Sequence, residues 1–311
     1  GECELSLASI RRQNYDPASI EVLVSVGRHR SIQRNEAIAA ATGEILFFLD
    51  NDVIIKDPEY INKHLALYQA DPRLASVGGP SLTPDSDSLL QHSFGQIFAS
   101  SFATQSIRAR YWPVGEKRQA GEKELILCNQ SMRADVVKKL GGFNSHFHSG
   151  NEENELINRI QKAGYYLLYD PHMSVERSQR KSLRAFCFQI AKYGKSRIEH
   201  FLIKPESFEL KFLAPLAFLA YLGTVPVAPL ILRGYFLALF YLPLFLYILL
   251  GFCSAVASYL RYRKLVVALL TFLLYPVHHA SYGLGNLIGL YRFYFPGKDR
   301  EIPVEIRKIV L

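Results

Sequence analysis

Residues 20–52 read IEVLVSVGRHRSIQRNEAIAAATGEILFFLDND and contain two strand-like patterns on either side of a helical one. Residues 20–26 are rich in valine, residues 31–42 are rich in alanine, and residues 44–49 form a short continuous apolar run. These patterns predict a strand, a helix and a second, fully buried strand. Their order predicts a right-handed βαβ unit of a parallel sheet, whose ligand crevice lies beyond the carboxyl ends of the strands.

The same kind of pattern continues along the first part of the chain. Residues 60–69 are expected to form a helix, and residues 74–77 a strand. Residues 83–122 are polar and mixed with aromatics, which favours a mobile or ligand-shaped loop. The chain then regains a strand, two helices and a last strand at residues 125–128, 133–140, 152–163 and 165–169. We therefore expect an α/β domain.

Two aspartates, Asp50 and Asp52, directly follow the second strand. An Asp-x-Asp triplet in this place puts two carboxylates on one side of an extended backbone, where they can hold a hard divalent cation against a diphosphate. The other interpretation is a solvated turn, because acidic residues commonly follow strands. The apolar run before the triplet and Arg34-Asn35 in the preceding helix favour the cation site.

Several blocks of the sequence resemble family 2 glycosyltransferases. Residues 34–52 are similar to the nucleotide-binding half of that family. Later blocks agree with its acceptor side in order and spacing, namely Gly141-Gly142-Phe143, Glu152-Glu153-Asn154-Glu155-Leu156, Arg159 and Ala163-Gly164-Tyr165. The resemblance covers residues 4–197 and implies a GT-A fold, which is Rossmann-like with a mostly parallel sheet, and an inverting reaction.

The resemblance implies roles on the donor side. Asp50 would contact the nucleotide, and Asp52 would bind the Mg²⁺ or Mn²⁺ that bridges the donor phosphates. This metal would offset the charge of the leaving group. Arg34 and Asn35 would contribute to the same donor site.

The resemblance also implies a catalytic base. The family places it at the second position of a Glu-Asp pair, which is Glu153 in this sequence, with Glu152 as the runner-up. The base would take the proton of the acceptor hydroxyl as the oxygen attacks the anomeric carbon. Without the flanking matches, the same cluster is interpreted as a solvated acidic helix start that the helix dipole stabilises.

Residues of three separate segments are expected at the acceptor. They are Asn129, Gln130, Gly142, Phe143, Gln189 and Tyr193. Helix capping explains the polar pair at 129–130 about as well. Gln189-Ile190-Ala191-Lys192-Tyr193 is similar to the Gln-x-x-Arg-Trp signature of processive members, although an interfacial helix supplies the same residue types.

Three features depart from the family pattern. The opening strand, which contacts the nucleotide base in the family, is absent before Gly1, so the sequence is expected to be a fragment of a longer protein. The usual Asp-rich turn is replaced by Gly27-Arg28-His29-Arg30, and the metal-binding His by Arg177. Arg cannot ligate a cation, so this replacement implies weaker metal binding or direct pairing of Arg177 with the diphosphate.

The C-terminal part is apolar, and residues 212–290 include no Asp or Glu. Three segments reach the length of about 20 residues that crosses a bilayer, at residues 212–232, 235–260 and 265–290. The first two fit membrane spans. The third contains Pro276 and two histidines, so it is expected either to cross, to be re-entrant, or to pack against the soluble domain.

Residues 181–204 place aromatics among Lys and Arg, which suits an interfacial amphipathic helix or, alternatively, a domain-packing helix. The predicted organisation is a GT-A domain at residues 1–180, an interfacial helix at 181–210, two to three transmembrane or re-entrant helices at 211–292, and a tail at 293–311.

A net charge of +8 suits nucleic acid, an anionic membrane surface or a phosphorylated substrate. The cations concentrate at residues 177–211, just ahead of the apolar region, which favours the cytoplasmic face of a membrane over nucleic acid. The 4 cysteines are far apart and form no C-x-x-C pair, which disfavours a metal cage or disulfide framework and indicates a reducing compartment.

These inferences predict a multi-pass enzyme of the inner (plasma) membrane whose catalytic domain is cytoplasmic. It would move one sugar from a nucleotide-diphosphate donor to a lipid-linked, polyprenyl-type glycan acceptor, with membrane lipids but no nucleic acid as further partners. The alternatives are a processive polysaccharide synthase and a non-catalytic membrane scaffold that keeps a degenerate sugar-nucleotide fold.

Overall fold

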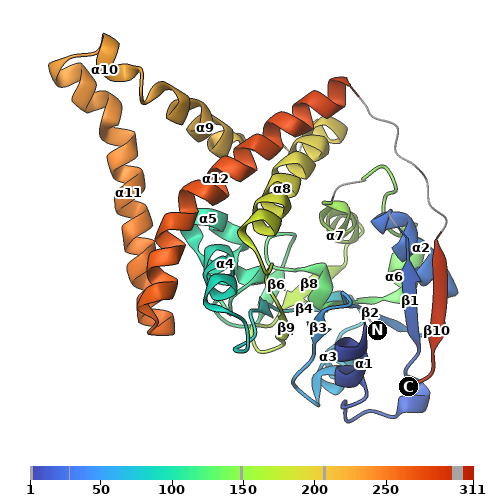
Figure 1. Ribbon diagram of the computed structural model, residues 1–311. Coiled ribbons are helices and arrows are strands. Elements are labelled where there is room, and N and C mark those ends of the chain that lie inside the picture. Colours follow the sequence, from blue (N-terminus) through green and yellow to red (C-terminus); the bar gives the residue numbers. More distant parts are fainter. Residues whose placement is uncertain (1–2, 28, 148–149, 206–207, 296–303) are drawn as a thin grey trace. The chain divides into compact units, whose positions relative to one another are not determined.

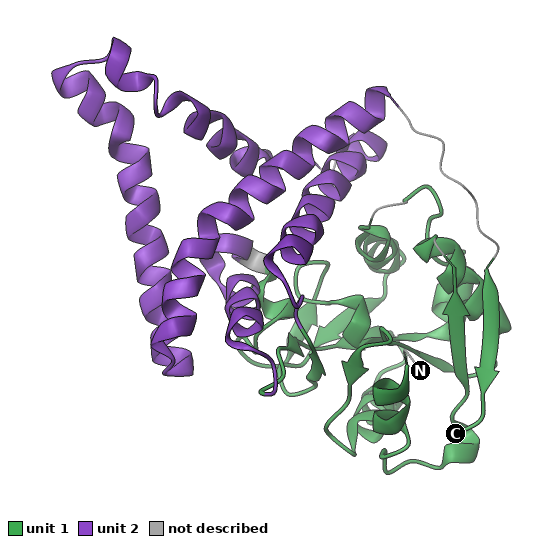
Figure 2. Cartoon of the chain, viewed as in Figure 1, with its two compact units in different colours: residues 1–85, 106–178, 298–311 green, residues 86–105, 179–297 purple. Residues whose placement is uncertain are grey.

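The structure, a computed structural model, describes residues 3–27, 29–147, 150–205, 208–295 and 304–311. Figure 2 colours the two compact units of the chain. Unit 1 comprises Gly1–Asp85, Ser106–Ser178 and Lys298–Leu311, and unit 2 comprises Ser86–Gln105 and Gln179–Gly297. Each unit therefore gathers segments that are far apart in the sequence. Gly1 and Arg28, on which two of the departures from the family pattern fall, lie outside the described residues.

The described residues of unit 1 form three sheets (Figure 1). The largest has the order β2-β7-β4-β8-β6, with β2 at Ile45–Phe48, β7 at Gln130–Arg133, β4 at Leu74–Gly78, β8 at Tyr166–Tyr169 and β6 at Arg118–Ala120. A second has the order β3-β9-β5, with β3 at Val53–Ile54, β9 at Val175–Arg177 and β5 at Ser81–Leu82. The third pairs β1, Val22–Val26, with β10, Glu305–Ile309.

The α/β class is confirmed, but the prediction of a mostly parallel sheet was wrong. Among the described strands only β4–β8 and β5–β9 are parallel pairs, and the others are antiparallel. The predicted βαβ pairing was also wrong, because β1 pairs with β10 and β2 pairs with β7. An apolar run indicates that a strand is covered, but it does not identify the neighbouring strand.

Helices cover both faces of the five-stranded sheet. In unit 1 these are α1 Glu4–Ile10, α2 Arg30–Ala40, α3 Tyr60–Ala70, α6 Ala134–Lys139 and α7 Glu152–Lys162, with the short turns η1 Pro17–Ser19, η2 Gln105–Arg110 and η3 Leu127–Asn129. The alternation of side chains along β2 sends Leu46 and Phe48 to the core under α2, α6 and α7, and Phe47 to the core under α1 and α3. The four β2 residues are only half-buried, so the prediction of a fully buried strand was too strong.

Unit 2 is helical in its described residues. Its elements are α4 Leu89–Ala99, α5 Ser101–Thr104, α8 Leu183–Ile203, η5 Leu210–Leu213, α9 Ala214–Thr224, α10 Ala228–Ile231, α11 Gly234–Tyr262 and α12 Leu265–Tyr294. The prediction of a loop at residues 83–122 was wrong, because α4 lies there and is buried from Gln91 to Ala99. The polar side chains of α4 led to the prediction of a loop. Some of them find partners inside the unit, as where Gln91 donates to the carbonyl of Gln179, whereas the buried ring nitrogens of His92 have no hydrogen-bond partner among the described residues.

The helix α12 packs very closely on α8. A Cβ on Gly285 of α12 would lie 2.1 Å from the carbonyl oxygen of Ala191. A Cβ on Gly194 of α8 would lie 2.2 Å from that of Tyr282. Only residues without a side chain allow two helix backbones to approach this closely. Together with α4, whose Phe94 stacks on Phe186 of α8 at 4.1 Å, these helices form the core of unit 2.

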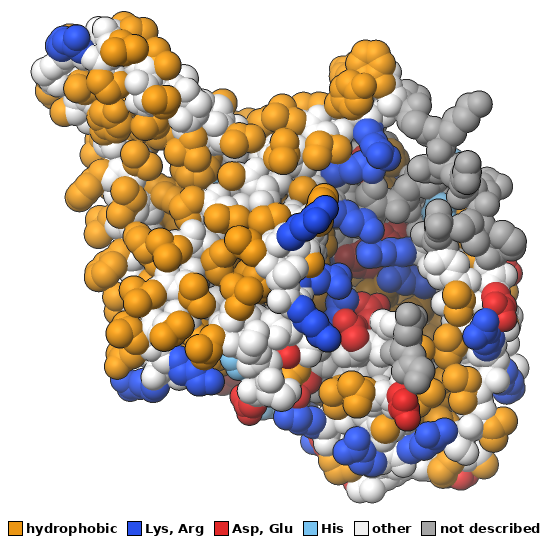
Figure 3. Space-filling view, viewed as in Figure 1, with side chains coloured by type: hydrophobic (Ala, Val, Ile, Leu, Met, Phe, Trp, Pro, Cys, Tyr) orange, Lys and Arg blue, Asp and Glu red, His pale blue; other side chains and the backbone are white. Residues whose placement is uncertain are grey.

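Within the described part of the chain, two helices, α11 and α12, are long and apolar enough to cross a membrane. In their most apolar windows, 6% of α11 but 44% of α12 is buried within the protein. Figure 3 shows hydrophobic side chains along α9, α10 and α11. These features suggest membrane association and show that α11 and α12 have different surroundings.

Candidate active site

The two aspartates of the triplet lie at the end of β2, where the chain turns into β3. The hydroxyl of the buried Ser6 on α1 lies 2.6 Å from the carbonyl oxygen of Val53 and 3.0 Å from that of Asn51, which fixes the turn. The side chains of Asp50 and Asp52 remain 38% and 42% exposed. They are therefore accessible to a ligand from solvent.

A single guanidinium bridges the two carboxylates. Arg177 lies opposite Val53 in the antiparallel β3–β9 pair, so its side chain reaches the acidic turn. Its Nη1 lies 3.0 Å from Asp50 Oδ2, and its Nε donates to Asp52 Oδ1 at 2.9 Å. The sequence predicted Arg177 as a donor-binding residue, and the structure brings it together with both aspartates.

The acidic turn offers two oxygen-donating side chains to a metal. Among the described residues, no group of three or more His, Cys, Asp or Glu side chains is arranged to hold a metal ion. Mg²⁺ is typically held by one or two carboxylates together with substrate phosphates and water. Asp50 and Asp52 fit that pattern, in which a phosphorylated ligand supplies further oxygens.

A second polar cluster lies at the start of α7. Glu152 is 1% exposed and forms an ion pair with Arg34 of α2, while its Oε2 has no hydrogen-bond partner in the part of the chain that is described. Burial raises the pKa of the Glu152 carboxyl, the charge of Glu153 raises it further, and Arg34 opposes both effects. Glu152 is thus a poorly solvated carboxylate in a fixed position.

Glu153 is the more accessible of the two carboxylates, with 18% of its side chain exposed. Its Oε1 lies 3.7 Å from Nη1 of Arg110, a buried residue that also donates to Asn154 Oδ1 at 2.7 Å and to the carbonyl of Glu122. Sequence reasoning missed Arg110, because it lies in the unpatterned stretch and follows no recognisable spacing.

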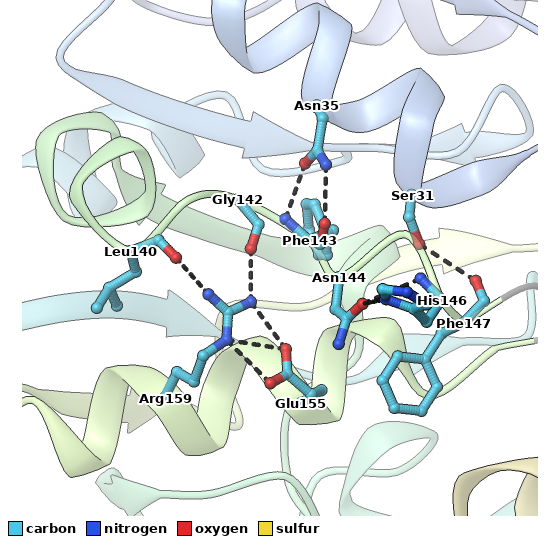
Figure 4. A network of polar contacts seen from close by, with 10 residues as sticks. All are labelled: Ser31, Asn35, Leu140, Gly142, Phe143, Asn144, His146, Phe147, Glu155 and Arg159. Atoms are coloured by element: carbon cyan, nitrogen blue, oxygen red, sulfur yellow. Dashed lines mark hydrogen bonds and ion pairs between the residues drawn. The ribbon is translucent and has the colours of Figure 1, made fainter. Parts of the chain in front are cut away.

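The Gly-Gly-Phe turn is locked to α2 and α7 by side chains of the predicted site (Figure 4). Asn35 donates to the carbonyl of Phe143 and accepts from its N–H, each at 2.8 Å. Gly142 has φ +69°, and a Cβ there would lie 2.5 Å from Asn35 Oδ1. Arg159, which pairs with Glu155, donates to the carbonyls of Leu140 and Gly142. Asn35 and Gly142 therefore shape the turn.

Aromatic contacts join the two polar clusters. The ring of Phe48, two residues before Asp50, meets that of Phe143 edge-on at 5.6 Å. The guanidinium of Arg34 lies 5.4 Å from the centre of the Phe143 ring and pairs with Glu152. The chain of contacts Phe48–Phe143–Arg34–Glu152 thus runs from the end of β2 to the start of α7.

The remaining predicted acceptor residues are Asn129, Gln130, Gln189 and Tyr193. Asn129 is fully buried, accepts from Tyr60 and donates to the carbonyls of Pro80 and Met173. Gln130 is 1% exposed and donates to Ser76, and it belongs to strand β7 rather than following a strand as predicted. Gln189 and Tyr193 lie on α8 in unit 2, where Gln189 donates to the Tyr193 hydroxyl at 2.8 Å.

Residues 7–139 match the family described as glycosyl transferase family 2. This matched segment is of the family 2 glycosyltransferase type. The matched residues include Arg34, Asn35, Asp50 and Asp52, while the acidic start of α7 and Arg177 follow them. No curated protein sequence matches the chain.

The chain also shares its fold with a solved structure. This structure is a mannosyltransferase from Pyrobaculum calidifontis, in complex with GDP-Man and Mn2+. The two chains are 14% identical and superpose with a TM-score of 0.58, over 93% of this chain and 83% of the mannosyltransferase. At this level of identity, the likeness establishes the common fold.

Proposed function

We propose that the chain transfers a sugar from a nucleotide-diphosphate donor to a membrane-associated glycan acceptor, with inversion at the anomeric carbon. One observation carries the proposal: Asp50 and Asp52 stand exposed at the end of β2, inside the family-matched segment, with Arg177 directed at both. The mannosyltransferase with the same fold was solved with GDP-Man and Mn2+, which supports a nucleotide sugar and a divalent cation as ligands.

In the donor half of the site, Asp50 and Asp52 would hold Mg²⁺ or Mn²⁺ against the diphosphate. The bound metal supplies positive charge that stabilises the leaving group. Arg177 presents a second cation at the same place and can pair with two phosphate oxygens at once. Arg34 and Asn35, predicted as donor ligands, would instead position the site through Glu152 and the Gly-Gly-Phe turn.

In the acceptor half, Glu153 would act as the general base. Its carboxylate takes the proton of the acceptor hydroxyl while that oxygen forms a bond to the anomeric carbon. The bond from this carbon to the donor oxygen breaks at the same time, and its electron pair leaves with the nucleoside diphosphate. Glu152 is too deeply buried for this role and would keep Glu153 and α7 in place.

The membrane part of the proposal rests on unit 2. The almost unburied apolar surface of α11 would lie in the plasma membrane, with the catalytic unit in the cytoplasm and a polyprenyl-linked glycan as the acceptor. Holding enzyme and acceptor in one surface would raise their effective concentration. Gln189 and Tyr193 remain proposed acceptor contacts on this basis.

The test is a turnover assay of the purified protein against a panel of nucleotide sugars with Mg²⁺ or Mn²⁺. We expect Glu153→Gln to lower kcat by a factor of about 10²–10⁴, the usual contribution of a general base, while donor binding persists. Asp52→Ala is expected to lose donor binding as well, because it removes a proposed ligand of the metal.

Asp57→Asn is the matched control, since Asp57 also pairs with a cation, Lys63, but lies outside the site. It should leave turnover and donor binding unchanged. Unchanged turnover in Glu153→Gln would remove this residue as the base. Nucleotide binding without turnover of any donor would favour the non-catalytic scaffold, and long polymeric products would favour the processive synthase.

A further inference from the structure

We propose that α12 lies along the surface of the bilayer, and that the chain crosses the bilayer only as a hairpin formed by α9–α10 and α11. Lipid covers the exposed apolar faces of these helices. This inference rests on the membrane association proposed above, and it replaces the choice between two and three spans by a definite topology.

The pairing of the C-terminal strand determines whether the chain crosses the membrane an even or an odd number of times. The chain leaves unit 1 after Ser178 and returns to it at Lys298. The returning strand β10 pairs with β1, and Lys308 Nζ lies 2.7 Å from Glu21 Oε1 beside this pair. Two paired strands lie on one side of a membrane, so the chain between them crosses an even number of times. Three crossings are thereby excluded.

We infer from the chain connections that the turn between α11 and α12 is on the same side of the membrane as unit 1, called here the catalytic side. Arg261 Nη1 donates to Gln96 Oε1 of α4 at 3.1 Å, and the ring of Tyr262 lies 6.0 Å from that of His92 on α4. Residues 86–105, which contain α4, are joined to unit 1 at both ends. An 11-residue helix is about 16 Å long, which is too short to cross a hydrocarbon core of about 30 Å.

The other end of α12 is held at the same level by α8. Gly285 and Gly289 of α12 pack against the backbone of Ala191 and Lys195 of α8. The helix α8 starts a few residues after unit 1 and carries several charged residues in its second half, so it is not suited to the hydrocarbon core. The chain re-enters unit 1 shortly after α12 ends. Both ends of α12 therefore lie on the catalytic side, and α12 does not cross.

The exposed side chains of α12 agree with a surface position. One face is exposed and apolar in the first and last parts of the helix, as at Leu265, Leu269, Leu273, Leu284 and Leu287, while Gly283 between them packs against Pro215 of α9. The opposite face is buried and includes polar residues such as Thr271 and Asn286. A helix with lipid on one side and protein on the other is expected in the plane of the interface rather than across it.

The two arms of the hairpin have the required length. The 29 residues of α11 span about 43 Å. The α9–α10 arm is interrupted at Pro226, but Val225 and Val227 on either side keep right-handed helical backbone angles. As one continuous helix, residues 214–231 would extend at most about 27 Å, close to the thickness of the hydrocarbon core. Tyr221 of α9 donates to the carbonyl of Phe240 on α11 at 2.8 Å, which ties the arms together.

The cations are distributed as this topology requires. Arg233, at the junction of α10 and α11, is the one charged residue in the sequence 212–260 and would lie at the far surface. Arg261, Arg263 and Lys264 follow α11 and would lie on the catalytic side. An excess of Lys and Arg marks the cytoplasmic side of membrane proteins, which agrees with a cytoplasmic unit 1. A hairpin of α11 and α12 would reverse this distribution.

Labelling of single cysteines with a membrane-impermeant maleimide tests the topology. The 4 native cysteines are first replaced. One cysteine is then introduced by Glu116→Cys in unit 1, Arg233→Cys, Arg263→Cys or Val310→Cys, and sealed vesicles are labelled before and after permeabilisation with detergent. We expect the 116, 263 and 310 variants to react from one side, and the 233 variant from the other.

Each labelling result tests the membrane topology without a measurement of turnover. Labelling of the 263 variant from the side opposite to the 116 and 310 variants would mean that α12 crosses, and would overturn the proposal. Labelling of all four from one side would exclude any crossing. The glycosyltransferase function is tested separately by turnover, so loss of activity does not affect the labelling result.

A depth measurement provides a second test if a labelling variant fails to fold. Nitroxides attached after Ile248→Cys in α11 and Leu284→Cys in α12 start from matched positions, 49% and 50% exposed. We expect the α11 probe to collide mainly with oxygen, which concentrates in the bilayer centre, and the α12 probe to collide more with a water-soluble relaxant. Equal depths would contradict the surface position of α12.

Discussion

Arg177 combines two properties at one residue. Its guanidinium is planar and permanently charged. It can bind two carboxylates, or it can bind two phosphate oxygens instead. In the structure it joins Asp50 and Asp52, so the acidic turn is neutralised in part before any ligand arrives. A cation that binds these carboxylates must therefore compete with the guanidinium, and a diphosphate would find the guanidinium already in place.

This competition predicts opposite effects of Arg177→Ala on metal and on donor. We expect Mn²⁺ to bind the free protein up to about fivefold more tightly, because an exposed ion pair contributes about 0–1 kcal/mol. Donor KM should rise by a factor of about 10 or more, since hydrogen bonds to charged groups contribute about 1.5–3 kcal/mol. Titration calorimetry with Mn²⁺ and steady-state kinetics measure the two effects.

Lys56→Ala is the control for Arg177, because Lys56 forms an ion pair with Glu176, the neighbour of Arg177 on β9. It removes a nearby cation that does not touch the acidic turn, so neither quantity should change. Weaker Mn²⁺ binding in Arg177→Ala would show that the arginine supports the metal site rather than competing with it.

Glu152 predicts a dependence of stability on pH. Its pKa is raised in the folded protein above the ordinary 4.5, so its contribution to stability is fully present below that value and is lost as pH rises through the raised pKa. The non-titrating Glu152→Gln variant lacks this loss. We expect the free energy of unfolding of the wild type to fall relative to that of the variant as the pH increases above 4.5, measured by urea unfolding.

Arg34→Ala is a control that should strengthen the effect of pH on stability, whereas Glu152→Gln should remove it. Arg34 favours the charged form of Glu152, so its removal should raise the pKa further and move the loss of stability to higher pH. Parallel stability profiles for the wild type and Glu152→Gln would mean that this carboxyl is not perturbed by folding.

At the scale of elements, the Gly-Gly-Phe turn is the junction that sets α2 and α7 relative to the sheet. Asn35 binds both backbone groups of Phe143, and Arg159 binds the carbonyls on either side of Gly141. The turn is thus shaped by hydrogen bonds from two helices, and the acidic start of α7 follows within a few residues.

Substitutions of the two glycines in this turn distinguish the cost of backbone strain from the cost of steric contact. Both have positive φ, +79° at Gly141 and +69° at Gly142, but a Cβ at Gly141 would meet nothing within 4 Å. We expect Gly141→Ala to cost about 1–2 kcal/mol of stability, the usual penalty of a left-handed backbone. Gly142→Ala should cost at least about 1 kcal/mol more, because it displaces Asn35 and its hydrogen bonds.

Chemical unfolding monitored by circular dichroism measures both variants. Equal losses of stability would show that Asn35 yields without cost, and that the close approach at Gly142 is not important. A loss of turnover in Gly142→Ala beyond its loss of stability would support the view that the turn positions the site.

At the scale of the whole molecule, the chain leaves its catalytic unit twice and returns twice. The first excursion contributes α4, and the second contributes the helices from α8 to α12. Because the last strand belongs to unit 1, the apolar helices are an insertion within the α/β unit rather than an appendage to it. This arrangement links the proposed membrane topology to the folding of the catalytic unit.

The sequence by itself determined the helical and strand segments with strong periodicity, such as α2, α3 and α7, and the family to which the acidic turn belongs. It also predicted that Arg177 belongs with the two aspartates of this turn. These features depend on neighbouring residues, and local spacing records them. The wrong predictions concern features that depend on residues distant in the sequence. These features are the pairing of β1 with β10, the antiparallel pairing of β2 with β7, and the helix α4 within a polar stretch.

The tertiary structure alone decided which predicted residues meet. It joins Arg177 to both aspartates, directs Asn35 and Gly142 to the turn, and buries Asn129 in the core. It also distinguishes α11 from α12, which are both long and apolar enough to cross a membrane but differ in how much of their surface protein covers. The physical reason is that burial and pairing depend on the whole fold, whereas a sequence pattern reports only the preference of a segment.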